Sequence, residues 1–428
     1  MPVFLQAKKY IAVSTLALCA TFHAATLHAA STTAVAPATV STSADTAAPV
    51  DAPVAQDATP PAAAPAAAPA AAPAAAPTWS VGPIDFSGLV DGYYSFNANH
   101  PTESGSDYPL YNQLRSFDTT SNGFALSMVK LSMAHGPDPI GFQVDLIFGP
   151  TADNNFYDNI EQAYVAWKPT KGKGFEADFG QFVTSAGAEV IETMNNPNYS
   201  RSLLFQYLIP LYHVGLRTSM PVSKTDTIGF QLVNGWNGWD GGDSNAGKTI
   251  GITNLYTKTK YNWALNYYTG PENGGTDKGF RNLIDTTLNL TPNAKWSGYI
   301  NYDYVQNRNA AEIGSTGTYK TIDLTHMQGI ALEARYQATA KTAFSGRYED
   351  IYDASGAITG TAKASLSEFT LTGEYKMAEG LLARIEYRRD MTDNPFFVKG
   401  QDTGLPKNLV KAQSTLEVGF VAFFGPKR

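Results

Sequence analysis

Residues 291–304 read TPNAKWSGYINYDY, and this stretch contains the pattern that decides the fold. It begins with a proline-containing turn. From Trp296 to Tyr304, apolar and aromatic residues then occupy every second position, and polar residues such as Asn301 and Asp303 lie between them. A period of two is the signature of a β-strand with one apolar and one polar face. The carboxylate on the second face excludes a dry core on that side.

The same alternation recurs along most of the chain. It is clear in residues 142–148, 175–179, 369–375 and 381–388. A water-exposed β-sandwich would show the same period, so the alternation alone does not separate a sandwich from a barrel. The predicted strands begin near residues 84, 123, 140, 159, 174, 211, 226, 248, 260, 281, 295, 326, 341, 365, 380 and 412.

The lengths of the connections separate the two folds. Breaks after every second strand are short, as in residues 135–139, 169–173 and 221–225. The other breaks are mostly long and rich in Gly, Asn and Asp, as in residues 98–122, 183–210, 307–325 and 391–411. Bacterial barrels sort their connections in this way, and a sandwich has no reason to do so. The sequence therefore predicts an all-β, transmembrane antiparallel barrel of about sixteen strands, with short periplasmic turns and long extracellular loops; fourteen or eighteen strands also fit.

The composition agrees with a barrel and excludes other classes. Of 428 residues, 12% are aromatic and only 16% are charged, and the net charge is −7. An acidic chain without a basic stripe is a poor nucleic-acid partner. The one cysteine, Cys19, lies in the predicted leader, so no disulfide or thiolate catalysis is expected. The histidines have no metal-ligand spacing, and no cofactor is expected.

Two segments precede the predicted barrel of residues 84–428. Lys8 and Lys9, followed by a short apolar run and small residues up to Ala30, predict a signal peptide over residues 1–30. Residues 31–83 are rich in Ala and Pro, and from Pro61 a proline recurs at every fourth position. This spacing prevents a helix and favours an extended spacer, so a disordered or extended periplasmic linker is expected.

The last strand ends on an aromatic residue. Residues 417–424 alternate and finish at Phe424, which is similar to the terminal signal that barrel-assembly machinery recognises. That machinery is therefore an expected partner during biogenesis, together with outer-membrane lipid. Aromatic residues near other strand ends predict girdles at the two membrane interfaces.

Several segments resemble the family of β-barrel porins described as OmpL-like. The resemblance rests on residues 88–94, 180–189, 198–202, 210–217 and 234–237, and it spans about residues 84–424. Residues 180–217 are its most specific part. The resemblance implies a pore in the bacterial outer membrane.

The segment after the fifth predicted strand, residues 183–210, is the candidate constriction. In many sixteen-stranded porins the corresponding loop folds inward and narrows the channel. Here the segment carries Glu189, Glu192 and Arg201. Strand alternation places five arginines on the lumen wall, where they could face these acids: Arg217, Arg335, Arg347, Arg384 and Arg388. Opposed charges across a lumen order water and select small polar solutes; alternatively, these groups only solvate the wall.

The predicted function is a water-filled outer-membrane channel for passive diffusion of small hydrophilic solutes or ions, without catalysis. One alternative is a non-conducting barrel that acts in adhesion or surface structure. A second is an outer-membrane hydrolase that uses His213 with Ser200 or Ser202. Sixteen-stranded porins are usually homotrimers, but the sequence fixes no interface.

Overall fold

The computed structural model describes residues 80–105, 109–237, 245–312, 319–360, 363–402 and 408–425. The expected signal peptide and nearly all of the expected linker lie outside these residues. Within them, sixteen long strands form one sheet, as the sequence predicted. The barrel strands are β2 Ile84–Asn97, β3 Gly123–His135, β4 Ile140–Phe148, β5 Ile160–Trp167, β6 Glu176–Val183, β7 Tyr212–Pro221, β8 Asp226–Val233, β9 Thr249–Lys258, β10 Tyr261–Gly270, β11 Arg281–Asn293, β12 Trp296–Glu312, β13 Tyr319–Gln337, β14 Thr342–Asp353, β15 Ala364–Ala378, β16 Leu381–Thr392 and β19 Ala412–Phe424.

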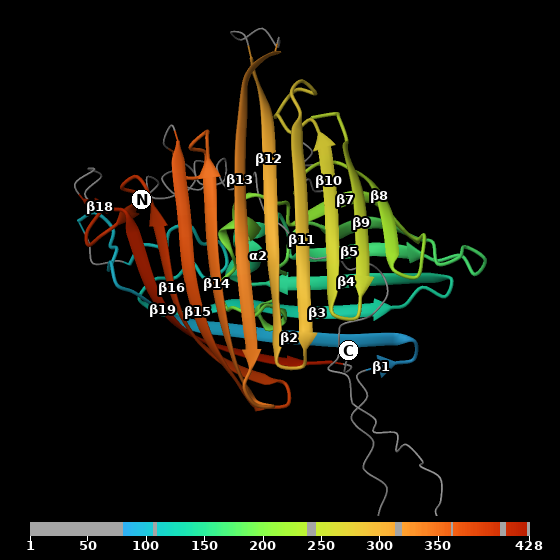
Figure 1. Cartoon of the computed structure of the whole chain (residues 1–428), viewed down its shortest axis with the longest axis horizontal. Helices are drawn as coiled ribbons and strands as arrows, with labels where there is room; N and C mark the ends of the chain where they lie inside the picture. The colour runs from blue at the N-terminus through green and yellow to red at the C-terminus, as the bar shows by residue number, and fades with distance from the viewer. Residues whose placement is uncertain are drawn as a thin grey trace, which may run out of the picture.

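The sheet closes on itself. Each barrel strand pairs antiparallel with the next, and β19 pairs with β2 in a register that places Val418 opposite Tyr94. In Figure 1 the strands of the near wall run almost vertically and those of the far wall almost horizontally, which is the crossing expected of tilted strands in a closed barrel. Closure satisfies the backbone hydrogen bonds within the barrel, which a sheet in a bilayer requires. A two-residue strand, β1 (Ser80–Val81), pairs back onto β2.

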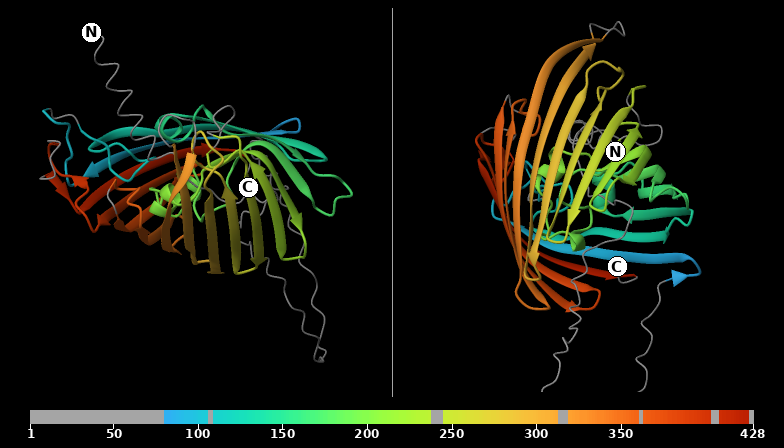
Figure 2. Two further views of the ribbon diagram at one scale, coloured as in Figure 1. Left: turned by 90° about the horizontal axis from the view of Figure 1, so that it is seen from above. Right: turned by 45° about the vertical axis from the view of Figure 1, so that its right-hand side comes forward.

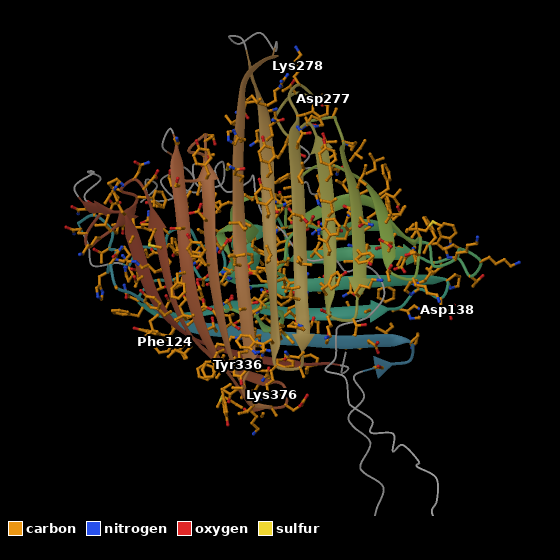
Figure 3. The ribbon with its side chains drawn as sticks, in the orientation of Figure 1. Phe124, Asp138, Asp277, Lys278, Tyr336 and Lys376 are labelled. Atoms are coloured by element: carbon orange, nitrogen blue, oxygen red, sulfur yellow. The ribbon has the colours of Figure 1, made fainter. Side chains whose placement is uncertain are left out.

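The connections alternate in length around the barrel. Short turns join β3 to β4, β5 to β6, β7 to β8, β9 to β10, β11 to β12, β13 to β14 and β15 to β16. In Figure 3, Asp138 and Lys376 mark the rim with these turns, and Asp277 and Lys278 lie at the opposite rim. The long connections at that opposite rim contain α2 (Pro150–Asn155) and the hairpin β17 (Phe397–Val398) with β18 (Leu409–Val410).

One predicted connection was wrong. Residues 307–325 were expected to form a long loop, but β12 continues to Glu312 and β13 already begins at Tyr319. The two strands pair beyond the neighbouring strands, with Arg308 opposite Leu324, and they rise above the others in Figure 1. The backbone of this ribbon is satisfied by its own pairing, so its polar sequence is compatible with strand structure outside the membrane. Every other barrel strand begins within two residues of its predicted start.

The two faces of the sheet have opposite character. On β16, Ile385 is 54% exposed on the outside, whereas Arg384 and Glu386 face inward and are buried. A belt of exposed apolar residues of this kind surrounds the barrel, as a lipid-facing surface requires. Exposed outward aromatics include Phe96, Phe148, Trp167, Tyr348, Tyr375, Tyr387 and Phe424. Among the described residues, no helix is long and apolar enough to cross a membrane.

Candidate functional site

Residues 184–211, which connect β6 to β7, fold into the barrel; we call this segment the inner loop. It hydrogen-bonds residues of β2, β11, β14 and β16, strands that are spread around the ring. The segment contains two short helical turns, η1 (Thr193–Asn195) and α3 (Leu203–Tyr207). Figure 2 shows helical turns in green enclosed by the strands. The inward fold expected of this segment is therefore present.

The helix α3 begins at a conventional cap and rests on a wall carboxylate. The side chain of Ser202 accepts a hydrogen bond from the amide of Phe205 at 2.9 Å. The amides of Leu203 and Leu204, which have no partner within the helix, donate to Glu349 on β14 at 2.9 Å each. Both leucine side chains are fully buried in the lumen. The apolar part of the inner loop therefore forms a core inside the barrel.

Glu189 meets one of the wall arginines named from the sequence. Its carboxylate accepts a hydrogen bond from Nη1 of Arg347 on β14 at 2.6 Å. The hydroxyl of Tyr299 on β12 and the amide of Ser202 donate to the same carboxylate at 3.0 and 2.6 Å. Glu189 is thus held by a charged and two neutral donors.

Arg347 is the centre of a larger buried network. Besides Glu189, its guanidinium lies 2.8 Å from Glu368 and 3.2 Å from Glu349, both wall residues. Arg388 on β16 lies 3.3 Å from Glu368 and 2.7 Å from Asp390. The side chains of this network are at most 1% exposed. Arg388 also donates to the main-chain carbonyl of Arg201 in the inner loop at 2.5 Å.

Arg384 on β16 binds the middle of the inner loop. Its guanidinium lies 2.6 Å from Glu374, which also pairs with Arg335 at 2.7 Å. The remaining donors of Arg384 reach main-chain carbonyls at 2.5, 2.8 and 3.2 Å, those of Thr193, Asn196 and Asn198. Arg335 is less buried, with 24% of its side chain exposed, and contacts no residue of the inner loop in these pairings. Arg384 therefore holds the loop directly, whereas Arg335 lies nearer the turn-bearing rim.

Glu192 does not face an arginine. It forms an ion pair with Lys130 on β3, a residue that sequence reasoning did not name. Lys130 also pairs with Glu161 on β5 at 2.5 Å and with Asp145 on β4 at 3.3 Å. The alternation on β3 placed a lysine on the lumen side, but the sequence does not say that the inner loop crosses to that wall.

The remaining predicted arginines lie apart from the acids of the inner loop. Arg217 on β7 pairs with Asp178 on β6 at 2.8 Å and stacks over the ring of Phe182. Arg201 is 1% exposed and does not point into open lumen. Its guanidinium donates to carbonyls of its own loop and lies 4.4 Å from the ring centroid of Phe117.

Two further wall carboxylates hold the inner loop. Glu386 on β16 accepts hydrogen bonds from the amides of Tyr199 and Ser200 at 2.6 and 2.9 Å. Asp91 on β2 accepts from the hydroxyl of Tyr199 at 2.8 Å. The ring of Tyr199 packs against Gly419 on β19, where a Cβ would lie only 2.4 Å from the ring. The alternation of apolar and polar residues places both acids on the inward face of their strands, and this pattern was the only sequence feature from which they could have been predicted.

A second connection, residues 98–122, also reaches the lumen wall. Arg115 lies 3.2 Å from Asp390 on β16 and donates to Thr415 on β19 at 3.0 Å. It also pairs with Asp118 of its own loop. Burial alone would raise the pKa of Asp118, but the adjacent guanidinium of Arg115 outweighs burial, and the pKa lies below its ordinary value.

The histidine named for a hydrolase does not meet its expected serines. His213 contacts the carbonyl of Gly235 and the hydroxyl of Thr184, both at 2.9 Å. The Ser200 hydroxyl instead lies beside Arg347 and Arg388. His213 and Thr184 are fully buried. The residues of that alternative are therefore not assembled as a catalytic set.

The fold and the lumen define the class of the protein: a sixteen-stranded antiparallel membrane barrel with a loop folded into a charged lumen. The chain belongs to the family described as "Putative beta-barrel porin-2, OmpL-like", whose model matches residues 83–424. No curated protein matches the sequence.

Solved structures share the barrel at low sequence identity. The anion-selective porin from Comamonas acidovorans is 11% identical, with a TM-score of 0.52 over 80% of this chain and 99% of that one. The outer membrane channel DcaP of Acinetobacter baumannii is 10% identical, with a TM-score of 0.52 over 80% and 96%. A loop L8 deletion mutant of OmpT of Vibrio cholerae is 12% identical, with a TM-score of 0.51 over 80% and 99%. These likenesses show the barrel fold, and the porin class of the chain rests on the family model that it matches.

Proposed function

We propose that the barrel is a channel for passive diffusion of small hydrophilic solutes or ions, and that the inner loop sets its narrowest part. The observation that carries the proposal is the attachment of this loop to the wall by Arg347, Arg384 and Arg388. A polar, charged inner face beside a lipid-facing apolar face is the arrangement of a water-filled barrel. Membership of a porin family supports the same assignment.

A second candidate is a barrel that does not conduct. It is favoured by the burial of the inner loop, where Leu203, Leu204 and Leu208 are 0% exposed, and by the burial of the arginine network. For this candidate, the inner loop closes the lumen, so that solutes would pass only if the loop moved. In that case the long connections at the rim opposite the turns would carry the function, which would be adhesion or surface structure.

Single-channel recording in planar bilayers separates the two candidates. We expect the folded full-length protein to conduct, and Arg384→Ala to raise the conductance because three bonds to inner-loop carbonyls are lost. Loss of one positive charge should also shift the ion preference toward cations. The matched control is Arg389→Ala, an exposed residue on the outer face of the same strand.

The outcomes are distinct. Folded, inserted protein that never conducts would support the non-conducting barrel. A conducting protein in which Arg384→Ala and Glu189→Gln both leave conductance and ion preference unchanged would refute the role of the inner loop. Liposome swelling with small sugars checks the passage of uncharged solutes.

The insertion and the oligomeric state of the barrel are the subject of two separate proposals. We propose that the last strand, β19, is recognised by barrel-assembly machinery and that the barrel forms homotrimers. Mild-detergent gel filtration with light scattering measures the oligomer. A monomer at micromolar concentration would contradict the trimer but not the channel.

A further inference from the structure

Three neighbouring strands bring a row of oxygen-bearing side chains together on the lumen wall. Asn266 on β10 lies opposite Asp285 on β11, and Asp285 lies opposite Asp303 on β12. All three side chains are 0% exposed. Thr287, two residues along β11 on the same face, is 1% exposed.

Asp285 and Asp303 have no cationic partner among the described residues, unlike buried acids such as Glu368 and Asp145. The two residues are cross-strand neighbours, and the amide nitrogen of Asn301 donates to both carboxylates, at 3.1 and 3.2 Å. In the part of the chain that the structure describes, no lysine or arginine pairs with either aspartate. By contrast, Glu368 lies within 3.3 Å of two arginines. Buried carboxylates are normally paired with a cation or coordinate a metal ion.

Three oxygens at this place are buried without a hydrogen-bond partner among the described residues. They belong to the carboxylate of Asp303, the amide of Asn266 and the hydroxyl of Thr287. The amide of Asn266 is part of the cluster, because its nitrogen donates to Asp285 at 2.7 Å. Buried oxygen atoms normally have a hydrogen-bond partner. Three unpartnered oxygens beside a pair of carboxyl groups therefore point to a bound cation that these oxygens coordinate.

We propose that Asp285, Asp303, Asn266 and Thr287 form a binding site for Ca²⁺. Carboxylate, amide and hydroxyl oxygens are the ligands of hard divalent cations, and an irregular set of them suits Ca²⁺ better than Mg²⁺, which demands octahedral geometry. Two carboxylates balance the charge of one such ion. The ion would neutralise the two carboxylates and would also be coordinated by the oxygens that have no hydrogen-bond partner.

The site anchors the beginning of the inner loop. The amide of Gly187 donates to Asp285 at 3.0 Å, and the amide of Asn266 donates to the carbonyl of Ser185 at 2.8 Å. A bound ion therefore fixes the residues against which the loop enters the lumen. This goes beyond the proposed channel, because the ion would bind in a conducting or a non-conducting barrel alike.

Terbium luminescence tests the site. Tb³⁺ replaces Ca²⁺ at oxygen sites and is excited through nearby aromatic rings; here Tyr268 lies two residues from Asn266 on the same face of β10. With folded full-length protein in detergent, after EDTA treatment, we expect one saturable Tb³⁺ signal that Ca²⁺ displaces. Asp303→Asn should weaken binding at least about tenfold, and Thr287→Val should weaken it severalfold while keeping both carboxylates.

The controls separate the site from general acidity. Asp138 lies in an exposed turn at the rim with the short turns, so Asp138→Asn removes one negative charge away from the site and should leave binding unchanged. Heat-modifiable gel migration shows that each variant is folded; if Asp303→Asn does not fold, Thr287→Val carries the test. No saturable binding by the folded wild type, or equal binding by folded Asp303→Asn or Thr287→Val, would overturn the proposal.

Discussion

Replacement of Arg347 by methionine removes the cation that joins the inner loop to the lumen wall. Methionine keeps most of the length and apolar volume of the arginine but has neither its charge nor its donors. The guanidinium lies 2.6 Å from Glu189, 2.8 Å from Glu368 and 3.2 Å from Glu349, and its side chain is 0% exposed. The variant therefore leaves three buried carboxylates short of a counterion.

The size of the effect follows from what each carboxylate retains. At an effective dielectric constant of about 20, two unit charges about 4 Å apart attract by about 4 kcal/mol, but desolvation offsets much of this. Removal of one partner from a buried pair typically costs about 3–5 kcal/mol. Glu368 retains Arg388 at 3.3 Å, whereas Glu189 retains only neutral donors. We expect Arg347→Met to lower the free energy of unfolding by about 3–5 kcal/mol and to release the inner loop.

Urea unfolding in lipid vesicles, followed by tryptophan fluorescence, measures this free energy, and limited proteolysis reports on the inner loop. The double variant Arg347→Met/Glu189→Gln should recover about 1–3 kcal/mol, because the uncompensated charge is removed as well. The control Arg389→Met alters an exposed arginine and should change stability by about 0.5 kcal/mol or less. If Arg347→Met unfolds at the same urea concentration as the wild type and its inner loop stays protected, the reasoning is wrong.

Two further predictions concern the packing and the acid response of the loops. Gly419→Ala places a methyl group 2.4 Å from the ring of Tyr199, so we expect the inner loop to become accessible to protease, whereas Gly346→Ala, whose nearest neighbour is 3.4 Å away, should not change accessibility. The pKa of Asp118 is lowered in the folded state, so its pairing stabilises the fold above its unfolded pKa of about 3.9 and loses this effect as pH falls through the lower folded value. Stability measured between pH 5 and pH 2 should therefore fall less steeply in Arg115→Met than in the wild type; equal slopes would show that the ion pair has no such role.

Much of the barrel follows from local sequence. Alternation and turn residues fixed the strand starts because both are short-range properties of the backbone. The exception, β13, begins at Tyr319 because its pairing with β12 continues beyond the neighbouring strands, as far as Tyr319 opposite Glu312. Loop composition cannot distinguish such a ribbon from a loop. The inward direction of the Arg347, Arg384 and Arg388 side chains could also be predicted from the sequence, because side-chain direction depends only on position within the strand.

The contacts between the inner loop and the lumen wall could not be predicted from local sequence. The inner loop touches β3 through Glu192 and Lys130, and β11 through Gly187 and Asp285. These contacts join residues that are 62 and 98 positions apart in the sequence, and they depend on the path of the loop through the lumen. No local pattern encodes that path.

The contacts also change the expected electrostatics of the lumen. Opposed rows of acidic and basic residues would set a field across the channel. Arg347 does pair with Glu189 of the inner loop at 2.6 Å. However, Arg347 and Arg384 also pair with glutamates of their own wall, Glu368 and Glu374, at 2.8 and 2.6 Å. These pairings within one wall reduce the net charge that Arg347 and Arg384 present to the lumen. Because the same arginines also bind the main chain of the inner loop, we expect them, in the proposed channel, to affect the width of the passage more than the sign of the ions that cross it.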